Sequence, residues 1–424
     1  MDVGRTAVND SGEQPELTLL TTPSGGVPLV IDTVDGVRRA AAMLAAGTGP
    51  FAVDTERASG YRYSQRAYLV QIRREGAGTV LIDPVAVNGR VEALAEVLNP
   101  AEWVLHAASQ DLPCLHELGL RPEVLFDTEL AGRLVGFERV ALGALVERQL
   151  GFRLEKGHGA ADWSRRPLPA DWLAYAALDV ELLLELRASL EAELIAQDKL
   201  AWALEEFEAV RTAPPPAPRA EPWRRTSGIH RLRSPRQYAA VRSLWQARNT
   251  IAQQRDIAPG RVLPDSAIVE AALHDPTGHA ELLSLPVFRG RAQRRMADVW
   301  SGALREAREL PKSDLPDPSP QHDGPPPPNR WAERDPAAAA RLSAARGALT
   351  ALAERLKMPV ENLAQPDLVR RLCWQPPAEI EVASVSAALA AGGARNWQIE
   401  QVAELLTTAL KAQPKATEKP AEKD

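Results

Sequence analysis

The sequence predicts an α/β domain followed by two small all-α helical bundles, and three observations lead to this division. Short apolar runs alternate with helical patterns over residues 25–212, which is typical of a sheet flanked by helices. Beyond residue 229 only helical periodicity is found. Two proline-rich stretches, 212–222 and 311–329, separate the three parts, because proline at that density continues neither a helix nor a sheet.

The first domain carries six candidate strands and four candidate helices. The strands are short apolar runs: PLVID (28–32), FAVDTE (51–56), LVQIR (69–73), TVLID (79–83), EWVLHA (102–107) and EVLFDT (123–128). The helices show the longer helical period: DGVRRAAAMLAAG (35–47), VEALAEVL (91–98), QDLPCLHELG (110–119) and one long run over 169–197.

The remaining boundaries follow from the same patterns. Residues 1–24 and 413–424 contain few apolar side chains, so we expect both segments to be disordered. After the domain of residues 25–212 we expect four further segments: a linker (213–228), a bundle (229–311), another linker (312–330) and a last bundle (331–412). The runs over 259–273 and 358–372 have similar internal spacing, which suggests that the bundle is duplicated.

The composition indicates a cytoplasmic protein. No apolar stretch reaches the roughly 20 residues needed to cross a bilayer, and the N-terminal residues lack the basic and apolar regions of a signal peptide. We therefore expect no membrane contact. Cys114 and Cys373 are the only cysteines and lie far apart, which argues against a disulfide scaffold or a cysteine metal site.

Acidic side chains follow two of the candidate strands and interrupt one helix. Asp54 and Glu56 are two positions apart at the end of a strand, so the strand period directs both to the same side. Asp111 follows another strand at the start of a helix. Asp179 interrupts an apolar helical stripe one turn after Tyr175, where an unpaired buried carboxylate would be costly.

If these four carboxylates converge, they repel one another unless a cation neutralises them. Mg²⁺ or Mn²⁺ suits such a site, because hard cations prefer oxygen ligands. Two ions about 3.5–4 Å apart form the arrangement that cleaves phosphodiesters, and the Tyr175 hydroxyl could then orient the attacking water. The alternatives are a strand end that meets solvent and, for Asp111, an acid placed at a helix N-terminus.

The acidic motifs resemble those of a known nuclease superfamily. Asp54-Thr-Glu56, His106-AASQ-Asp111 and Tyr175-xxx-Asp179, in this order, resemble the DEDD superfamily of 3′–5′ exonucleases, in the subgroup with a tyrosine in the third motif. The surrounding sequence is similar to that of the ribonuclease D family in four stretches: LFDT (125–128), LGALVERQLGFRLEKG (142–157), ADWSRRPL (161–168) and YAALDVELLLEL (175–186). The bundle of residues 229–311 resembles an HRDC domain, and the last bundle resembles a second, diverged one.

This resemblance implies a ribonuclease H-like mixed sheet and a metal-dependent 3′–5′ exoribonuclease that releases 5′-mononucleotides, in the processing of tRNA or other small RNA. It implies five catalytic residues: Asp54, Glu56, Asp111, Tyr175 and Asp179. Asp54, Glu56 and Asp179 would hold the ion that activates water, and Asp54 with Asp111 would hold a second ion. Thr55 would offer its backbone to the terminal nucleotide.

Basic residues are concentrated at the start of the second part. The net charge is −6, yet ten arginines and only two acids lie between Arg219 and Arg261. Arginines interleaved with aromatic side chains suit single-stranded RNA 3′ ends, such as those of tRNA precursors. The residues expected to contact nucleic acid are Arg231, Arg233, Arg242, Trp245 and Arg248. The alternative is that the bundles serve packing or oligomerisation, with Trp245 in the core.

Two other functions stay open from the residues alone. One is a DNA exonuclease of the same superfamily, because no readable motif reports recognition of the 2′-hydroxyl. The other is a noncatalytic RNA-binding scaffold, against which the complete carboxylate set argues. We expect a monomer.

Overall fold

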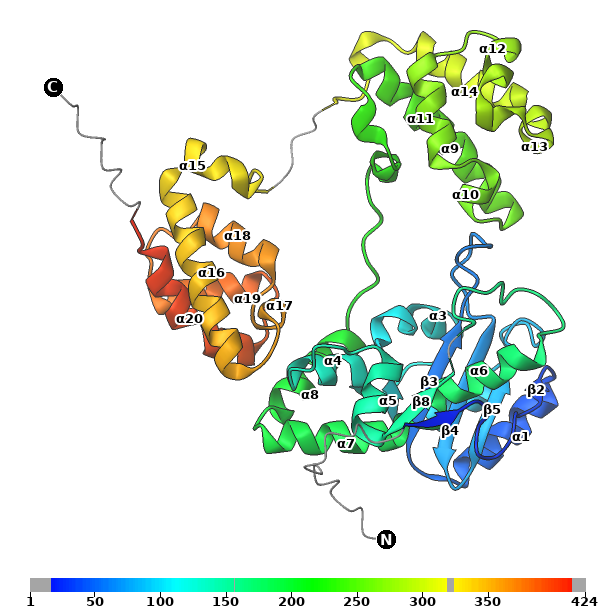
Figure 1. The fold of residues 1–424 in the computed structure, drawn as a ribbon, viewed down its shortest axis with the longest axis vertical. Helices are drawn as coiled ribbons and strands as arrows, with labels where there is room; N and C mark the ends of the chain where they lie inside the picture. Colours follow the sequence, from blue (N-terminus) through cyan, green and yellow to red (C-terminus); the bar gives the residue numbers. More distant parts are fainter. Residues whose placement is uncertain (1–16, 156, 319–323, 414–424) are drawn as a thin grey trace.

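The computed structural model describes residues 17–155, 157–318 and 324–413. The centre of the first domain is a six-stranded mixed sheet in the order β2-β5-β4-β3-β6-β7, of which Figure 1 labels β2, β3, β4 and β5. Strands β3, β4 and β5 form an antiparallel meander, whereas β6 and β7 continue the sheet in parallel with β3. The strands span Val30–Ile31 (β2), Thr48–Glu56 (β3), Leu69–Glu75 (β4), Gly78–Ile82 (β5), Glu102–Leu105 (β6) and Val124–Asp127 (β7).

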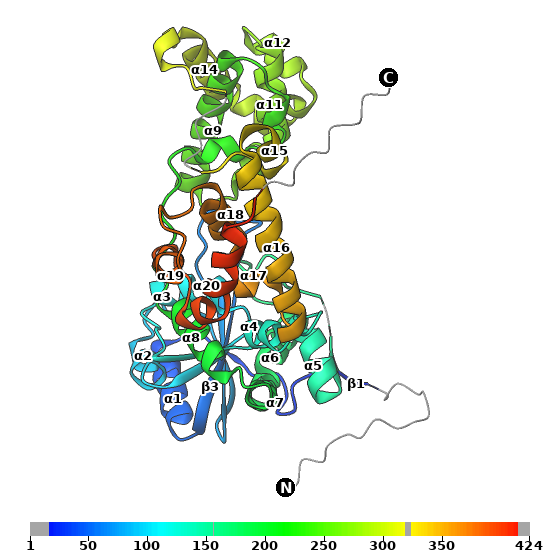
Figure 2. The same ribbon diagram turned by 90° about the vertical axis from the view of Figure 1, so that its left-hand side faces the viewer.

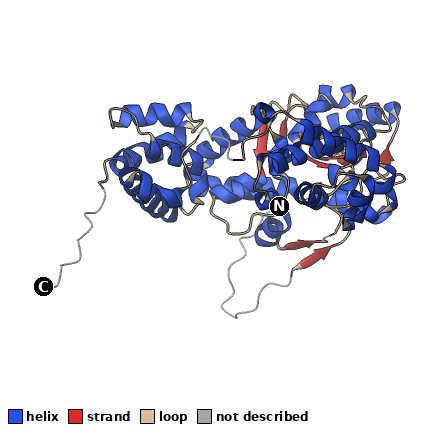
Figure 3. Cartoon of the chain, turned by 90° about the horizontal axis from the view of Figure 1, so that it is seen from above, coloured by secondary structure: helices blue, strands red, loops and turns tan. Residues whose placement is uncertain are grey.

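Helices cover both faces of this sheet, in agreement with the predicted α/β class (Figure 3). Val70 and Ile72 of β4 share a core with Val37 and Leu44 of α1, while Leu69 lies in a separate cluster with α6 on the opposite face. The helices of this domain span Val34–Ala45 (α1), Glu92–Leu98 (α2), Leu112–Glu117 (α3), Thr128–Leu134 (α4), Leu142–Leu150 (α5), Ala170–Glu181 (α6), Leu183–Ala196 (α7) and Leu200–Arg211 (α8).

Two expectations for this domain were wrong. The run over 169–197 is two helices, because Leu182 leaves the helical conformation between α6 and α7. The segment 1–24, expected to be disordered, contains strand β1 (Thr18–Leu20), which pairs in parallel with β8 (Phe152–Leu154). Residues 1–16 lie outside the described residues, as does most of the predicted C-terminal tail.

The second part of the chain is a helical bundle with its own core and is called the second bundle. Trp300, Phe288 and Leu244 are fully buried in it, and so is Trp223, which lies in the predicted linker 213–228. The bundle therefore begins earlier than residue 229. Its helices span Pro235–Arg255 (α9), Pro259–Val262 (α10), Asp265–His274 (α11), His279–Ser284 (α12), Arg291–Arg295 (α13) and Ala297–Glu309 (α14), with 3₁₀ turns at Pro222–Arg225 (η2), Ile229–Arg231 (η3) and Pro286–Arg289 (η4).

The last bundle shares a continuous core with the exonuclease-like first domain. Buried residues of its helices, such as Trp397 and Leu406, belong to the same cluster as Phe207 of α8. Figure 2 shows α16 and α20 in the region of α4 and α8. The helices span Trp331–Arg334 (α15), Pro336–Leu356 (α16), Val360–Leu363 (α17), Pro366–Trp374 (α18), Val382–Ala391 (α19) and Asn396–Leu410 (α20), preceded by 3₁₀ turns at Lys312–Asp314 (η5) and Pro328–Arg330 (η6). Among the described residues, no helix has the length and apolar character that a membrane crossing requires.

Candidate active site

Three carboxylates meet where α6 packs against the C-terminal end of β3. Asp54 and Glu56 come from the strand and Asp179 from the helix, which contacts β3, β4 and β5. One carboxylate oxygen of each lies within 4.8 Å of those of the other two. The strand and the packed helix thus bring together residues that are more than a hundred positions apart in the chain.

The fourth carboxylate, Asp111, lies beside this group and is positioned by a local distortion of the backbone. Ala107 has φ 58°, and the amides of Ala107 and Ala108 donate to the Asp127 carboxylate at 3.1 and 2.8 Å. Asp111 then precedes α3 without capping it through its side chain. Instead it accepts a hydrogen bond of 2.8 Å from the Thr55 hydroxyl, so Thr55 connects Asp111 to β3.

The electrostatics of the four carboxylates show that they are crowded. Burial, followed by the charges of the neighbouring acids, raises the pKa of Asp54 and of Glu56 well above the usual range. Burial also raises the pKa of Asp111 to about 6 and that of Asp179 to about 7. Four oxygen-donor groups whose charges oppose one another fit a divalent cation, which would stabilise their ionised forms.

A buried amide adds to the polar character of this site. Gln71 of β4 is the cross-strand partner of Asp54 and is fully buried. Neither its amide nitrogen nor its amide oxygen has a hydrogen-bond partner within the described residues. Because an unsatisfied buried amide is costly, its presence beside Asp54 is typical of a site that is completed by a ligand.

Tyr175 lies one helical turn before Asp179 and forms a hydrogen bond with its carboxylate. Burial, followed by the negative charges of Asp179, Glu56 and Asp54, raises the pKa of Tyr175, so its hydroxyl keeps the proton. Gly159 faces this hydroxyl so closely that a Cβ atom there would lie 3.4 Å from it. The hydroxyl therefore stands between the carboxylates and the 159–161 segment.

A pocket of about 330 Å³ opens beside the carboxylates. Thr55, Glu56 and Arg57 line one side together with Ser59 and Gly60, and residues 159–161 line the other. Sequence reasoning did not single out Arg57, whose guanidinium lies 3.6 Å from Asp111. The only sequence signal for Arg57 is its position next to the Asp54-Thr-Glu56 motif.

The five predicted nucleic-acid contacts in the second bundle have unequal surroundings. Arg231 is half exposed and pairs with Glu270 at 2.8 Å. Arg233 is exposed, and Arg242 donates to the Asp314 carbonyl at 3.1 Å. Trp245 is partly buried against the bundle core.

Arg248 does not fit its predicted role in binding nucleic acid. Its side chain is only 6% exposed and forms an ion pair of 2.6 Å with Asp265 of α11. It also donates to the Leu263 carbonyl at 3.0 Å. These contacts attach α9 to α11, because a buried guanidinium is stabilised by partners inside the protein. We therefore correct this assignment: Arg248 is a structural residue.

The mixed sheet and its acidic group define the first domain as a 3′–5′ exonuclease domain. Residues 28–195 match the family model described as 3'-5' exonuclease. Domains of this type use divalent metal ions, in keeping with the acidic group formed by Asp54, Glu56 and Asp179. Residues 237–304 match the HRDC domain, and residues 324–410 match a model described as 3' to 5' exonuclease C-terminal domain.

The chain belongs to the ribonuclease D family, a family of hydrolytic 3′–5′ exoribonucleases. It is 34% identical over 300 residues to ribonuclease D of Jannaschia sp., covering 68% of this chain and 77% of that protein. It is also 38% identical over 222 residues to ribonuclease D of Nitrobacter hamburgensis, covering 50% of this chain and 58% of that protein.

Solved structures agree with this assignment over most of the chain. A protein from Bifidobacterium adolescentis is 38% identical and superposes with a TM-score of 0.86, over 94% of this chain and all of that one. Escherichia coli RNase D, described as an exoribonuclease involved in structured RNA processing, is 26% identical with a TM-score of 0.66, over 91% of this chain and all of that one.

Proposed function

We propose that this chain removes 5′-mononucleotides from RNA 3′ ends at the carboxylate group formed by β3 and α6. The observation that carries the proposal is the convergence of Asp54, Glu56 and Asp179 within 4.8 Å, with Asp111 bonded to the adjacent Thr55. Two divalent ions, Mg²⁺ or Mn²⁺, would be held by these residues: Asp54, Glu56 and Asp179 for one ion, and Asp54 with Asp111 for the other.

Each residue of the candidate site has a distinct role in this proposal. When bound, the ions supply a water of lowered pKa and neutralise the leaving oxygen. The Tyr175 hydroxyl, kept protonated by its surroundings, orients the attacking water. Thr55 fixes Asp111 through its hydroxyl and offers its backbone to the terminal nucleotide. Arg57, at the edge of the pocket, is placed to meet a phosphate.

The substrate class in this proposal is RNA with a single-stranded 3′ end, including precursors of tRNA and other small RNA. Its support is the name of the curated relatives and the Arg-rich surface of the second bundle, where Arg231, Arg233, Arg242 and Trp245 would contact the RNA. A monomer that acts in the cytoplasm is part of the same proposal.

The test is a denaturing-gel time course on RNA labelled at the 3′ or the 5′ end. With Mg²⁺ or Mn²⁺, the 3′ label should appear at once as a mononucleotide, while the 5′-labelled product shortens stepwise; with chelator, neither should occur. A matched DNA strand should be degraded more slowly. Immediate release of the 5′ label, or equal rates with chelator, would contradict the proposal.

Variants assign the roles within the site. Asp54→Ala and Asp179→Asn should abolish mononucleotide release while leaving the circular dichroism spectrum unchanged, because they remove metal ligands from a folded protein. Tyr175→Phe should lower kcat by about 100-fold or less, since it removes an orienting hydroxyl and no ligand. Near-normal turnover by Asp179→Asn would remove that residue from the mechanism.

A further inference from the structure

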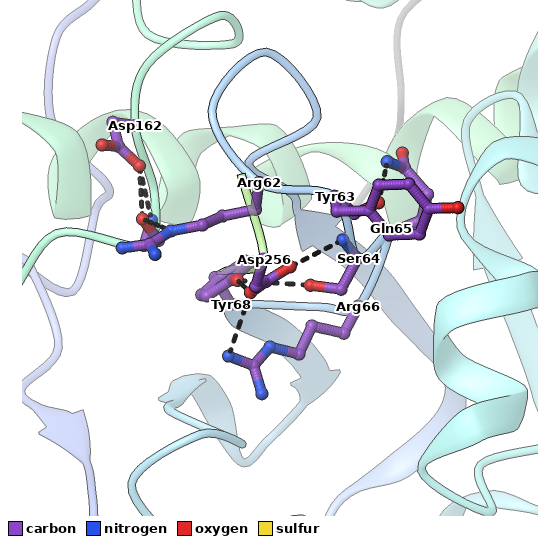
Figure 4. A network of polar contacts seen from close by, with 9 residues as sticks. Arg62, Tyr63, Ser64, Gln65, Arg66, Tyr68, Asp162 and Asp256 are labelled. Carbon is purple, nitrogen blue, oxygen red and sulfur yellow. Dashed lines mark hydrogen bonds and ion pairs between the residues drawn. The ribbon is translucent and has the colours of Figure 1, made fainter. Parts of the chain in front are cut away.

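The second bundle touches the exonuclease domain next to the candidate active site. The turn after α9 and the first residues of α10, residues 256–261, are here called the α9–α10 corner. It contacts the segment between β3 and β4, residues 57–68, here called the β3–β4 loop. Figure 4 shows the contacts of Asp256 with this loop. The loop begins directly after Glu56, so it connects the corner to the carboxylates.

Asp256 is the centre of the contact. It ends α9 in the left-handed conformation, with φ 48°. Its carboxylate accepts a hydrogen bond of 2.8 Å from the Ser64 amide and one of 3.5 Å from the Tyr68 hydroxyl, and it lies 3.9 Å from Arg66 (Figure 4). A single carboxylate thus holds the second half of the β3–β4 loop.

The rest of the corner holds the first half of the loop. The Ala258 amide donates to the Tyr61 carbonyl at 2.9 Å. Arg261 donates through Nε to the Gly60 carbonyl at 2.7 Å, and its guanidinium stacks over the Tyr61 ring at 4.0 Å. Backbone groups of the loop accept both hydrogen bonds, so the corner restrains the path of the main chain and not merely the side chains.

The loop in turn shapes the pocket beside the carboxylates. Arg57, Ser59 and Gly60 form one of its walls. Arg62 donates through Nε to the Ser164 hydroxyl at 2.7 Å, three residues beyond the 159–161 segment that forms the other wall. The corner therefore restrains one wall of the pocket directly, through the Gly60 carbonyl.

We infer that the second bundle positions the active-site loop, with Asp256 and Arg261 as positioning residues for the exonuclease reaction. This role is separate from any RNA contact by the bundle, and it rests on the proposed function. The bundle completes one wall of the pocket that receives the terminal nucleotide, so its presence at that site raises turnover even on substrates too short to contact its arginines.

The test compares variants of the two corner residues, together with a control variant in the last bundle, on substrates of two lengths. Asp256→Gly keeps the left-handed backbone and removes the acceptor, whereas Asp256→Asn keeps both, because asparagine also adopts this conformation and can accept from Ser64. Lys357→Gly is the matched control, since Lys357 ends α16 in the same conformation, with φ 50°. The substrates are a trinucleotide and a 20-nucleotide single-stranded RNA, with Mn²⁺.

On the trinucleotide, Asp256→Gly and Arg261→Ala should each lower kcat about tenfold, the effect of losing one hydrogen bond. Asp256→Asn and Lys357→Gly should stay within about twofold of the unchanged protein. The KM for the 20-nucleotide RNA should change little. Wild-type turnover of the trinucleotide by both Asp256→Gly and Arg261→Ala, with a loss only on the longer RNA, would overturn the inference.

Trypsin gives a second readout that needs no turnover. Arg62 and Arg66 are cleavage sites within the β3–β4 loop. If the corner restrains this loop, trypsin should cut Asp256→Gly there about tenfold faster than Asp256→Asn. Equal cleavage would overturn the inference. If the unchanged protein released no mononucleotide, the proposed function would fail, and the trypsin comparison would still decide whether the corner restrains the loop.

Discussion

The two helical bundles follow one plan but serve the exonuclease domain differently. Helices α9 and α16 are both 21 residues long and start 101 residues apart, at Pro235 and Pro336. The same spacing separates their left-handed C-caps, Asp256 and Lys357. It also separates α10 from α17 and the start of α11 from that of α18. This spacing supports the prediction that the bundle is duplicated.

The corner after the long helix meets the exonuclease domain in both bundles, at different places. In the second bundle it holds the β3–β4 loop through Asp256. In the last bundle the Lys357 carbonyl lies against Gly136 at the end of α4, where a Cβ atom would come within 2.0 Å of it. The preceding carbonyl, of Leu356, accepts a hydrogen bond of 2.6 Å from Lys199. One corner contacts the loop that follows the candidate active site, and the other joins a shared core.

This difference shows that apolar burial and contact with the β3–β4 loop are divided between the two bundles. The last bundle covers apolar surface of the exonuclease domain, with Trp397 stacked on Trp202 at 4.9 Å and its indole donating to Glu206 at 3.0 Å. The second bundle keeps a separate core around Trp300 and meets the domain mainly through polar contacts. Stability of the catalytic domain should therefore depend on the last bundle, and turnover on the second.

The largest effect should come from truncating the shared core. Trp397→Ala should lower the free energy of unfolding of the catalytic domain by about 3–5 kcal/mol, because it leaves a large cavity and removes the hydrogen bond from the indole to Glu206. Thermal unfolding followed by circular dichroism, with mononucleotide release as a probe of the catalytic domain, measures this. Both signals should be lost at the same lowered temperature.

Trp300→Ala is the matched change in the second bundle. Trp300 is fully buried and its indole donates to Gln293 at 2.9 Å, so the local cost should be similar. The catalytic domain should nevertheless unfold at an unchanged temperature, since the two cores are separate. If Trp300→Ala lowered the unfolding temperature of the catalytic domain as much as Trp397→Ala does, the division between the copies would be wrong.

A smaller effect, with a distinctive pH dependence, is expected at Lys199. This residue is 3% exposed and donates to the carbonyls of Leu134 and Leu356 and to the amide oxygen of Gln197. Burial, followed by the charge of Lys357, lowers the pKa of Lys199 to about 8. Between about pH 8 and roughly pH 10.4 the unfolded chain therefore binds more protons than the folded one. The free energy of unfolding should rise as pH increases through this window.

Lys199→Met should remove this rise and cost about 1–3 kcal/mol, because buried carbonyls lose their donor. Denaturant unfolding at several values between pH 7 and pH 10 measures both quantities. Lys411→Met, at the exposed end of α20, is the control and should keep the slope of the unchanged protein. Equal slopes for the two variants would show that Lys199 does not titrate in the folded state as its burial implies.

The sequence predicted well those elements whose burial is reflected in their local residue pattern. All six strands occur at the predicted apolar runs, because alternation or continuous apolar character reflects burial in a sheet directly. Asp54, Glu56 and Asp179 could be placed together from strand and helix periods combined with the family motifs. The break at Leu182 had no such signal, since leucine is a good helix former.

Features that depend on distant partners escaped prediction. Helical spacing placed Arg248 on one face with Arg242 and Trp245, but Asp265 from the next helix draws it into the interior. The contact between Asp256 and Ser64 joins residues 192 positions apart. No local pattern reports such a pair, because it arises only once the bundle docks on the exonuclease domain.

The smallest expected effect tests whether RNA is bound by one copy or by both. Arg231, Arg233 and Arg242 replaced together by Gln should make the slope of log affinity against log salt less negative by roughly 2, since each single-strand phosphate that an arginine neutralises contributes about 0.7 to that slope. The second bundle should show this effect because its corner contacts the β3–β4 loop, part of which lines the pocket proposed to receive the RNA end. Fluorescence anisotropy of labelled RNA, in an Asp54→Ala background that cannot degrade it, gives the slope.

The matched change in the last bundle replaces the exposed residues Arg334, Arg346 and Arg355 by Gln. It removes the same formal charge, so an effect of overall charge alone would alter both slopes equally. A change confined to the second bundle would show that RNA passes over that copy on its way to the carboxylates. A larger change for the last bundle would place the RNA path along α15 and α16, and the second bundle would then act on the reaction only by holding the β3–β4 loop.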